Sequence, residues 1–170
     1  MKKIIVLIAA MLLSVGAYAQ KTAFINTETI FRAVPEYATA LSEIDHFAQH
    51  EQTKVDAEFA KIAEMYERYQ YQKQSLSENA RKQVEDNIIR LEKEATENQS
   101  AVFGTDGTLM RMRIEKLKPI QDRVFAVVDL VGKLHKCDAI IDISNNPSIV
   151  YYNKDNDLTQ EVIDSLGINK

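Results

Sequence analysis

The longest pattern in the chain is a heptad repeat, in which apolar residues are spaced alternately four and three positions apart. It runs over residues 37–76 and resumes over residues 84–102. The positions at this spacing are called the seam positions. They are Tyr37, Leu41, Ile44, Ala48, Glu51, Val55, Glu58, Ile62, Met65, Tyr69, Gln72 and Leu76, followed by Val84, Ile88, Leu91, Ala95, Asn98 and Val102. No glycine or proline lies within residues 36–102, and Ser75 or Ser77 can cap a new helix. The pattern predicts two helices that fold back as an antiparallel coiled-coil hairpin with a turn near residue 77.

The return helix is interrupted before the chain reaches its final segments. Gly104 and Gly107 break it within "FGTDGT", and helical periodicity then resumes. Pro119 lies in this resumed part and should kink it. We therefore expect a helical arm over residues 36–133, with a break near residues 104–107.

Polar side chains interrupt the seam, among them Glu51, Glu58 and Asn98. A rigid coiled coil would carry Leu or Ile at such positions. Packing should therefore be weak near these residues, and the arm should be able to flex there.

Short apolar runs lie at both ends of the arm sequence. "TAFIN", "DAIIDIS" and "SIVYYN" predict three strands, and "DLTQEVIDSLG" predicts a short terminal helix. A sheet of three short strands from one chain has unprotected edges, which favours oligomerisation. We therefore expect residues 20–35 and 134–170 to form a β body with a C-terminal helix.

The expected fold class is α+β, with a long antiparallel coiled-coil hairpin arm that projects from a small β body completed by oligomerisation. The apolar residues of the end segments are candidates for the oligomeric body. These candidates are Phe24, Ile25, Phe31, Ile140, Ile141, Ile143, Ile149, Val150, Tyr151, Leu158, Val162 and Leu166.

Residues 1–19 have the pattern of a cleaved secretory signal. Lys2 and Lys3 precede an apolar run, which ends on the small-x-small sequence "AYA". The run is short for a bilayer span. We expect export across the inner membrane and a mature chain, from about Gln20, without a stable membrane anchor.

The mature chain should be acidic. Removal of the two lysines of the signal leaves 19 basic and 25 acidic residues. Nucleic-acid binding relies on basic side chains that neutralise phosphates. A nucleic-acid partner is therefore not expected.

No catalytic or metal-binding arrangement emerges from the sequence. His46 and His50 have a spacing that can bind a metal. However, "HFAQH" lacks the glutamate of a zinc hydrolase, and no third ligand is evident. Both histidines are therefore expected to be exposed residues of a helix. "GTDG" lacks the lysine of a phosphate loop, and "NKDND" lacks the glycine of a calcium loop. Cys137 cannot form an internal disulfide, and its apolar surroundings favour a buried thiol over a reactive one. We expect neither a cofactor nor an enzyme.

The stretches "TAFINTETIFRAVPEY", "DAIIDIS" and "SIVYYNKDNDLTQEVIDSL", together with the heptad hairpin, resemble the Skp (OmpH-like) family of periplasmic chaperones for outer-membrane proteins. The resemblance covers nearly all of residues 22–166. It implies a homotrimer in which the terminal strands and last helix of three chains build the β body. Three helical hairpins would then surround a cavity that takes up unfolded outer-membrane β-barrel proteins.

The resemblance implies an ATP-independent holdase in the periplasm, which binds unfolded clients and prevents their aggregation. The alternative is a structural or adaptor coiled-coil protein of the cell envelope that binds one folded partner. An adaptor predicts one localised binding patch. A holdase instead predicts many weak contacts that add through effective concentration.

The arm carries aromatic and apolar residues close to its predicted tip, in and around "MYERYQYQ". An aromatic side chain there offers apolar area together with a hydroxyl, which suits weak contacts to an extended client. Ordinary packing within the hairpin is the alternative, above all for residues on the seam. The client-contact candidates are Phe59, Met65, Tyr66, Tyr69 and Tyr71.

The arm of this chain is acidic, whereas family members are known that have strongly basic arms. Residues 36–78 carry four basic and nine acidic side chains, which disfavours a lipopolysaccharide site. A basic excess occurs only in residues 104–136, with seven basic and four acidic side chains. These basic residues either face the mouth of a cavity or form a solvated face, and the solvated face is the favoured interpretation.

Overall fold

A computed structural model describes residues 20–168, so the predicted signal peptide lies outside the described residues. The chain divides into two compact units. The hairpin unit comprises residues 34–123. The body unit comprises the described residues on either side, 20–33 and 124–168.

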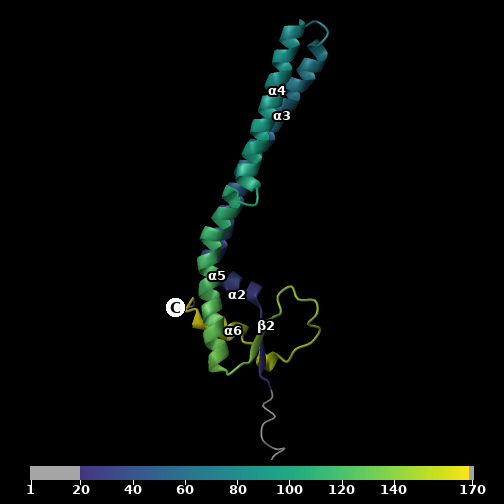
Figure 1. Ribbon diagram of the computed structural model, residues 1–170. Helices are drawn as coiled ribbons and strands as arrows, with labels where there is room; N and C mark the ends of the chain where they lie inside the picture. The colour runs from purple at the N-terminus through teal and green to yellow at the C-terminus, as the bar shows by residue number, and fades with distance from the viewer. Residues whose placement is uncertain (1–19, 169–170) are drawn as a thin grey trace, which may run out of the picture. The chain divides into compact units, whose positions relative to one another are not determined.

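Two long helices dominate the hairpin unit. α3 spans Pro35–Gln72, α4 spans Glu78–Phe103, and they lie side by side in opposite directions (Figure 1). At about 1.5 Å per residue, α3 is about 57 Å long. The turn covers residues 73–77, where Ser77 caps α4 by accepting a hydrogen bond from the Ala80 amide at 3.3 Å.

The seam positions form the core of the hairpin. Ile62 and Tyr69 of α3 and Ile88 and Ala95 of α4 are buried in one cluster. Half-buried Met65, Leu76, Val84 and Leu91 pack against this cluster. Because these residues recur at heptad spacing on both helices, one chain closes this apolar core by itself.

The break after α4 is built around its two glycines. The Gly104 amide donates to the Ser100 carbonyl at 2.9 Å, and the Gly107 amide donates to the Gly104 carbonyl at 2.9 Å. A Cβ at Gly104 would overlap the Ser100 carbonyl oxygen. α5, Thr108–Leu134, follows the break and contains Pro119 in its interior.

The body unit contains a two-stranded parallel sheet. β1, Thr22–Ile25, pairs with β2, Ala139–Asp142, so that Phe24 lies opposite Ile141. Its helices are α2, Thr27–Ala33, the end of α5, and α6, Thr159–Ser165. The short 3-10 helix η1, Lys154–Asn156, precedes α6.

The other edge of β1 is occupied by the segment that leads into α6. Phe24 forms an isolated parallel bridge with Asp157, and the Leu158 amide donates to the Phe24 carbonyl at 2.8 Å. The Asn26 amide donates to the Thr159 hydroxyl at 2.9 Å. β1 is therefore the central element, and within residues 20–168 no strand pairs with the outer edge of β2.

Helices α2, α5 and α6 supply the core beneath this sheet. Ile30, Val131 and Val162 are completely buried, and Ala23 and Ile25 of β1 are only 2% and 3% exposed. A Cβ at Gly132 would lie 2.7 Å from Cδ1 of Ile140, which shows how closely α5 approaches β2. His135 Nε2 also lies 2.7 Å from the Glu161 carboxylate, which ties α5 to α6.

The predicted strand "SIVYYN" is wrong for the single chain. Residues 148–153 contain no strand, and the side chains of Val150 and Tyr151 are 96% and 84% exposed. Asn145 has a left-handed backbone with φ of 54°, and Pro147 follows. The segment leaves the sheet after β2, and an extended segment without a neighbouring backbone cannot form ladder hydrogen bonds.

A helix that crosses a lipid bilayer must be both long and apolar. Among residues 20–168, no helix combines the length and the hydropathy that this requires.

Candidate functional site

The client-contact candidates differ sharply in exposure. Tyr71 is 93% exposed beside the turn, Tyr66 is 51% exposed, and Phe59 is partly exposed further along α3. Met65 is half-buried against the hairpin core. Exposed aromatic side chains thus line part of the helix near its tip.

Tyr69 belongs to the core and not to the exposed surface. Its side chain is only 4% exposed, and its hydroxyl donates a hydrogen bond to the Glu85 carboxylate on α4. The Lys73 ammonium lies 5.4 Å from its ring centroid. The hydrogen bond to Glu85 and burial raise the pKa of the Tyr69 hydroxyl. Packing, which was the alternative for this residue, is therefore its observed role.

Two adjoining hollows lie along the α3–α4 face. One, of 590 Å³, is lined by residues that include Phe59, Ala63 and Tyr66 of α3 and Glu92 of α4. The other, of 290 Å³, is lined by residues that include Tyr66, Lys73, Ile89 and Glu92. Because Tyr66 and Glu92 line both, the two hollows form one groove, which we call the arm groove.

Sequence reasoning missed most of the residues that line the arm groove, among them Ile89 and Glu92. Ile89 is 62% exposed although it follows the buried seam residue Ile88, and Glu92 follows the seam residue Leu91. Adjacent side chains on a helix point about 100° apart, so only one of two adjacent apolar residues occupies a narrow coiled-coil seam. The pair Ile88 and Ile89 in α4 could therefore have predicted that one of the two isoleucines lies outside the seam.

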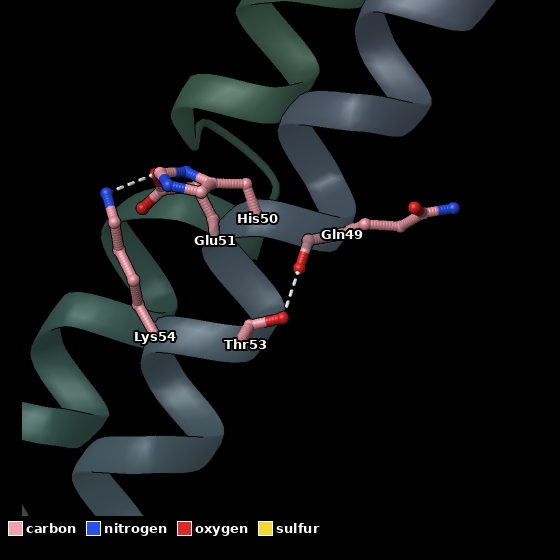
Figure 2. Close-up of polar contacts among 5 residues, drawn as sticks. All are labelled: Gln49, His50, Glu51, Thr53 and Lys54. Atoms are coloured by element: carbon pink, nitrogen blue, oxygen red, sulfur yellow. Dashed lines mark hydrogen bonds and ion pairs between the residues drawn. The ribbon is translucent and has the colours of Figure 1, made fainter.

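The polar seam positions satisfy their side chains with local partners. Figure 2 shows Glu51 beside Lys54 and His50, with the Lys54 ammonium at 2.7 Å and His50 Nδ1 at 3.1 Å. The hydrogen bond from Lys54 lowers the pKa of Glu51, against the opposing effect of burial. Across the hairpin, the Asn98 amide donates to the Glu58 carboxylate at 3.3 Å.

Several basic residues of α5 are paired within the hairpin unit. Arg123 donates to the Glu36 carboxylate at 3.2 Å, and Lys116 donates to the Glu43 carboxylate. The pKa of Glu36 is lowered by a backbone hydrogen bond and by Arg123. The hydrogen bond to Glu43 raises the pKa of Lys116. These two cations thus bridge α5 to α3.

The residues weighed for metal binding do not gather into a site. Within residues 20–168, no group of three or more His, Cys, Asp or Glu side chains could hold a metal ion. His50 is engaged with Glu51, and "NKDND" forms η1 with Asn153 as its cap. Cys137 is a half-buried free thiol.

The candidates for the oligomeric body fall into three sets according to their exposure. Ile25, Leu158 and Val162 are buried within one chain, and Val150 and Tyr151 are exposed. The remaining candidates are half-buried: Phe24, Phe31, Ile140, Ile141, Ile143, Ile149 and Leu166. Phe24 contacts Tyr152 with the two rings tilted by 40° and their centroids 5.1 Å apart, and Phe31 meets Phe125 edge to face at 6.2 Å.

A helical hairpin joined to a small α+β unit, with exposed apolar side chains on both, is an architecture suited to binding other polypeptide chains. The family model described as outer membrane protein (OmpH-like) matches residues 21–166. The chain therefore belongs to the OmpH-like family, a family of periplasmic chaperones for outer-membrane proteins. No curated protein matches the chain closely enough to count as a relative.

Proposed function

We propose that the mature chain is an ATP-independent periplasmic holdase. It binds unfolded outer-membrane β-barrel proteins between the helical hairpins of a homotrimer and keeps them from aggregating. Contact with the client comes from the exposed apolar side chains of the hairpin, with Phe59, Tyr66 and Tyr71 as the leading residues and Met65 as a lesser one.

The single observation that carries the proposal is the exposure of aromatic side chains beside a core that is already closed. Burial of Ile62, Tyr69 and Ile88 holds the hairpin together, so Tyr66 and Tyr71 are not required for its packing. An exposed aromatic residue makes apolar contacts with an extended chain without demanding one sequence. Membership in a chaperone family supports the same conclusion.

The homotrimer is supported by the body unit. Val150 and Tyr151 are almost completely exposed, and the outer edge of β2 has no partner strand within the described residues. A second copy of the chain could supply both an apolar cover and a neighbouring backbone. Assembly would then bring three hairpins together around the client.

Aggregation of a diluted client tests the proposal. A urea-unfolded outer-membrane β-barrel protein is diluted into buffer with and without the mature chain, in the absence of nucleotide, and light scattering is followed. We expect scattering to fall toward the buffer baseline as the chain approaches stoichiometric amounts. Unchanged scattering at a severalfold excess of chain would contradict the proposal and favour an adaptor that binds a folded partner.

A further inference from the structure

The arm groove has regular walls. On α3 and its C-cap, the residues that line it are spaced alternately four and three positions apart, and they are Phe59, Ala63, Tyr66, Gln70 and Lys73. On α4, the lining residues follow the same spacing and are Glu85, Ile89, Glu92 and Thr96. Residues at this spacing share one helix face, so two stripes run beside each other along the hairpin.

The base of the groove is fixed by the hairpin core. Ile62, Tyr69 and Ile88 also line the hollows, and each is at most 7% exposed. Their packing holds the two stripes at a constant separation, so the groove exists before any ligand enters. A preformed groove binds with a smaller loss of conformational entropy than a surface that must first be ordered.

One charge in the groove lacks a partner. The carboxylate of Glu92 makes no hydrogen bond or ion pair with any other residue of the described chain. Glu85, the other acid of the groove, accepts from Tyr69 and has the Lys73 ammonium at 3.8 Å. Glu92 thus places a negative charge without an ion-pair partner in the hollow that the exposed side chains of Tyr66 and Ile89 also line.

The dimensions of the groove match an extended peptide. From Phe59 to Lys73 the helix rises about 21 Å, which is the length of about six residues of an extended strand. Side chains of a strand alternate between its two faces, so every second residue would face the groove. Transmembrane β-strands carry this alternation of apolar and polar residues.

We propose that the arm groove binds an extended client segment of about six residues, with apolar or aromatic side chains at alternate positions and a lysine or arginine that pairs with Glu92. The inference rests on the proposed holdase function and names the class of segment that the hairpin recognises. Tyr66 and Ile89 provide apolar contact. Glu92 provides the preference for basic segments.

Charge also argues against a second hairpin as the occupant. α3 carries eight acidic and three basic side chains, and α4 carries six acidic and four basic ones. Two such hairpins placed face to face would repel each other. An unfolded segment with a basic residue would instead be attracted.

Fluorescence anisotropy with two labelled peptides tests the proposal on the full mature chain. Both peptides have eight residues that alternate leucine or tyrosine with serine. One carries two lysines in place of serines, and the other carries two glutamates. At low salt, where charges act over about 30 Å or less, we expect the lysine peptide to bind about two- to fivefold more tightly than the glutamate peptide.

Matched variants identify the residues that cause the preference for lysine and those that make the apolar contacts. Glu92→Gln should abolish the preference for lysine, whereas Glu94→Gln, which removes an equal charge from an exposed acid that pairs with Arg90, should keep it. Tyr66→Ala should weaken both peptides about tenfold. Leu41→Ala, at an exposed apolar residue of α3 that lines neither hollow, should change the affinity less than twofold. Ile89→Ser provides a second apolar variant, with an expected loss similar to that of Tyr66→Ala.

Three outcomes would overturn the arm groove as the binding site. The first is an equal effect of Glu92→Gln and Glu94→Gln on the lysine preference. The second is wild-type affinity in both Tyr66→Ala and Ile89→Ser. The third is a change in oligomeric mass in these two variants, which would assign the groove to a contact between copies. In each case the wild-type chain would still suppress client aggregation. Loss of that suppression in the wild type would instead refute the holdase itself.

Discussion

The hairpin unit and the body unit differ in how completely a single chain buries their apolar side chains. In the hairpin, heptad residues from α3 and α4 bury one another, and Ile62, Tyr69 and Ile88 are covered within one chain. In the body, Ile30 and Val162 are equally buried, but Val150 and Tyr151 remain exposed beside a two-stranded sheet. The apolar core of the hairpin is covered within one chain, whereas the body keeps apolar side chains exposed to solvent.

The difference follows from the sequence separation of the contacts. The hairpin pairs two neighbouring helices across a five-residue turn, and each heptad adds the same kind of contact. The body joins β1 to β2 across more than a hundred residues, with a register fixed by only four residue pairs. A short sheet with an open edge gains little from burial on its own, so its stability should depend on assembly.

The largest effect is expected where the body should meet its partners. The double change Val150→Asp and Tyr151→Asp places two charges on the exposed segment, and burial of these charges at an interface would be costly. We expect the mass in solution, measured by light scattering after chromatography, to fall from that of three chains to that of one. Tyr71→Asp, at an equally exposed tyrosine of the hairpin, should leave the mass unchanged. Equal masses for the double variant and the wild type would contradict the assignment of this interface.

The next effect concerns the closed core of the hairpin. Ile88→Ala removes a buried side chain and should lower the free energy of opening by about 2–5 kcal/mol. Amide hydrogen exchange at residues 55–95 measures this opening, and the mass should not change. Ile89→Ala, at the neighbouring exposed isoleucine, should stay within about 0.5 kcal/mol of the wild type. Similar losses in both variants would show that the seam is not the core.

A smaller effect is expected at Asp142, which joins β2 to α2. Its carboxylate accepts from the Thr27 amide at 3.1 Å and the Thr27 hydroxyl at 2.6 Å, and from the Ser144 amide at 2.9 Å and the Ser144 hydroxyl at 2.8 Å. Asp142→Asn cannot accept all four hydrogen bonds and should destabilise the body by about 1–3 kcal/mol. Urea denaturation at neutral pH, followed by circular dichroism, measures this loss.

The pH dependence of stability sharpens this prediction. Burial raises the pKa of Asp142, but the hydrogen bonds from Thr27 and Ser144 outweigh it and leave the pKa lowered. Because the folded pKa lies below the unfolded value of about 3.9, the carboxylate contributes stability at neutral pH. That stability is lost as the pH falls through the folded pKa. In Asp142→Asn, this part of the acid sensitivity should be missing, and an unchanged acid profile would contradict the prediction.

The smallest effect is expected for Tyr69→Phe, which keeps the buried ring but loses the hydrogen bond to Glu85. Thermal unfolding should show a lower midpoint, with a decrease smaller than that of Ile88→Ala. The raised pKa of Tyr69 means that the hydrogen bond stabilises the hairpin up to about pH 10 and that this stability is lost as the pH rises through the folded pKa. The variant should therefore lack the alkaline loss that the wild type shows.

The sequence predicted the hairpin well because a heptad repeat is a local pattern. Spacing alone identified the residues that pack at the seam, including Ile62 and Ile88. The short strands β1 and β2 were also recognisable from their apolar runs. Residues 148–153 were wrongly predicted as a strand, since strand formation depends on a neighbouring backbone that this segment does not meet within one chain.

The candidate site was predictable only in part. Tyr66 and Tyr69 look alike in sequence, yet one is exposed and the other is buried on the seam. Ile89 and Glu92 were missed because a groove depends on which residues flank the seam on both helices at once. Spacing of a single helix cannot reveal that pairing, although Phe59 and Tyr66, seven positions apart, already marked one wall.

The mass of a complex with an unfolded client tests the central proposal most directly. The purified mature chain is measured by light scattering alone and after dilution of a urea-unfolded outer-membrane β-barrel protein into it, without nucleotide. We expect the mass of three chains, which rises by the mass of one client while the solution stays clear. A monomer or dimer that leaves the client to aggregate would contradict the holdase.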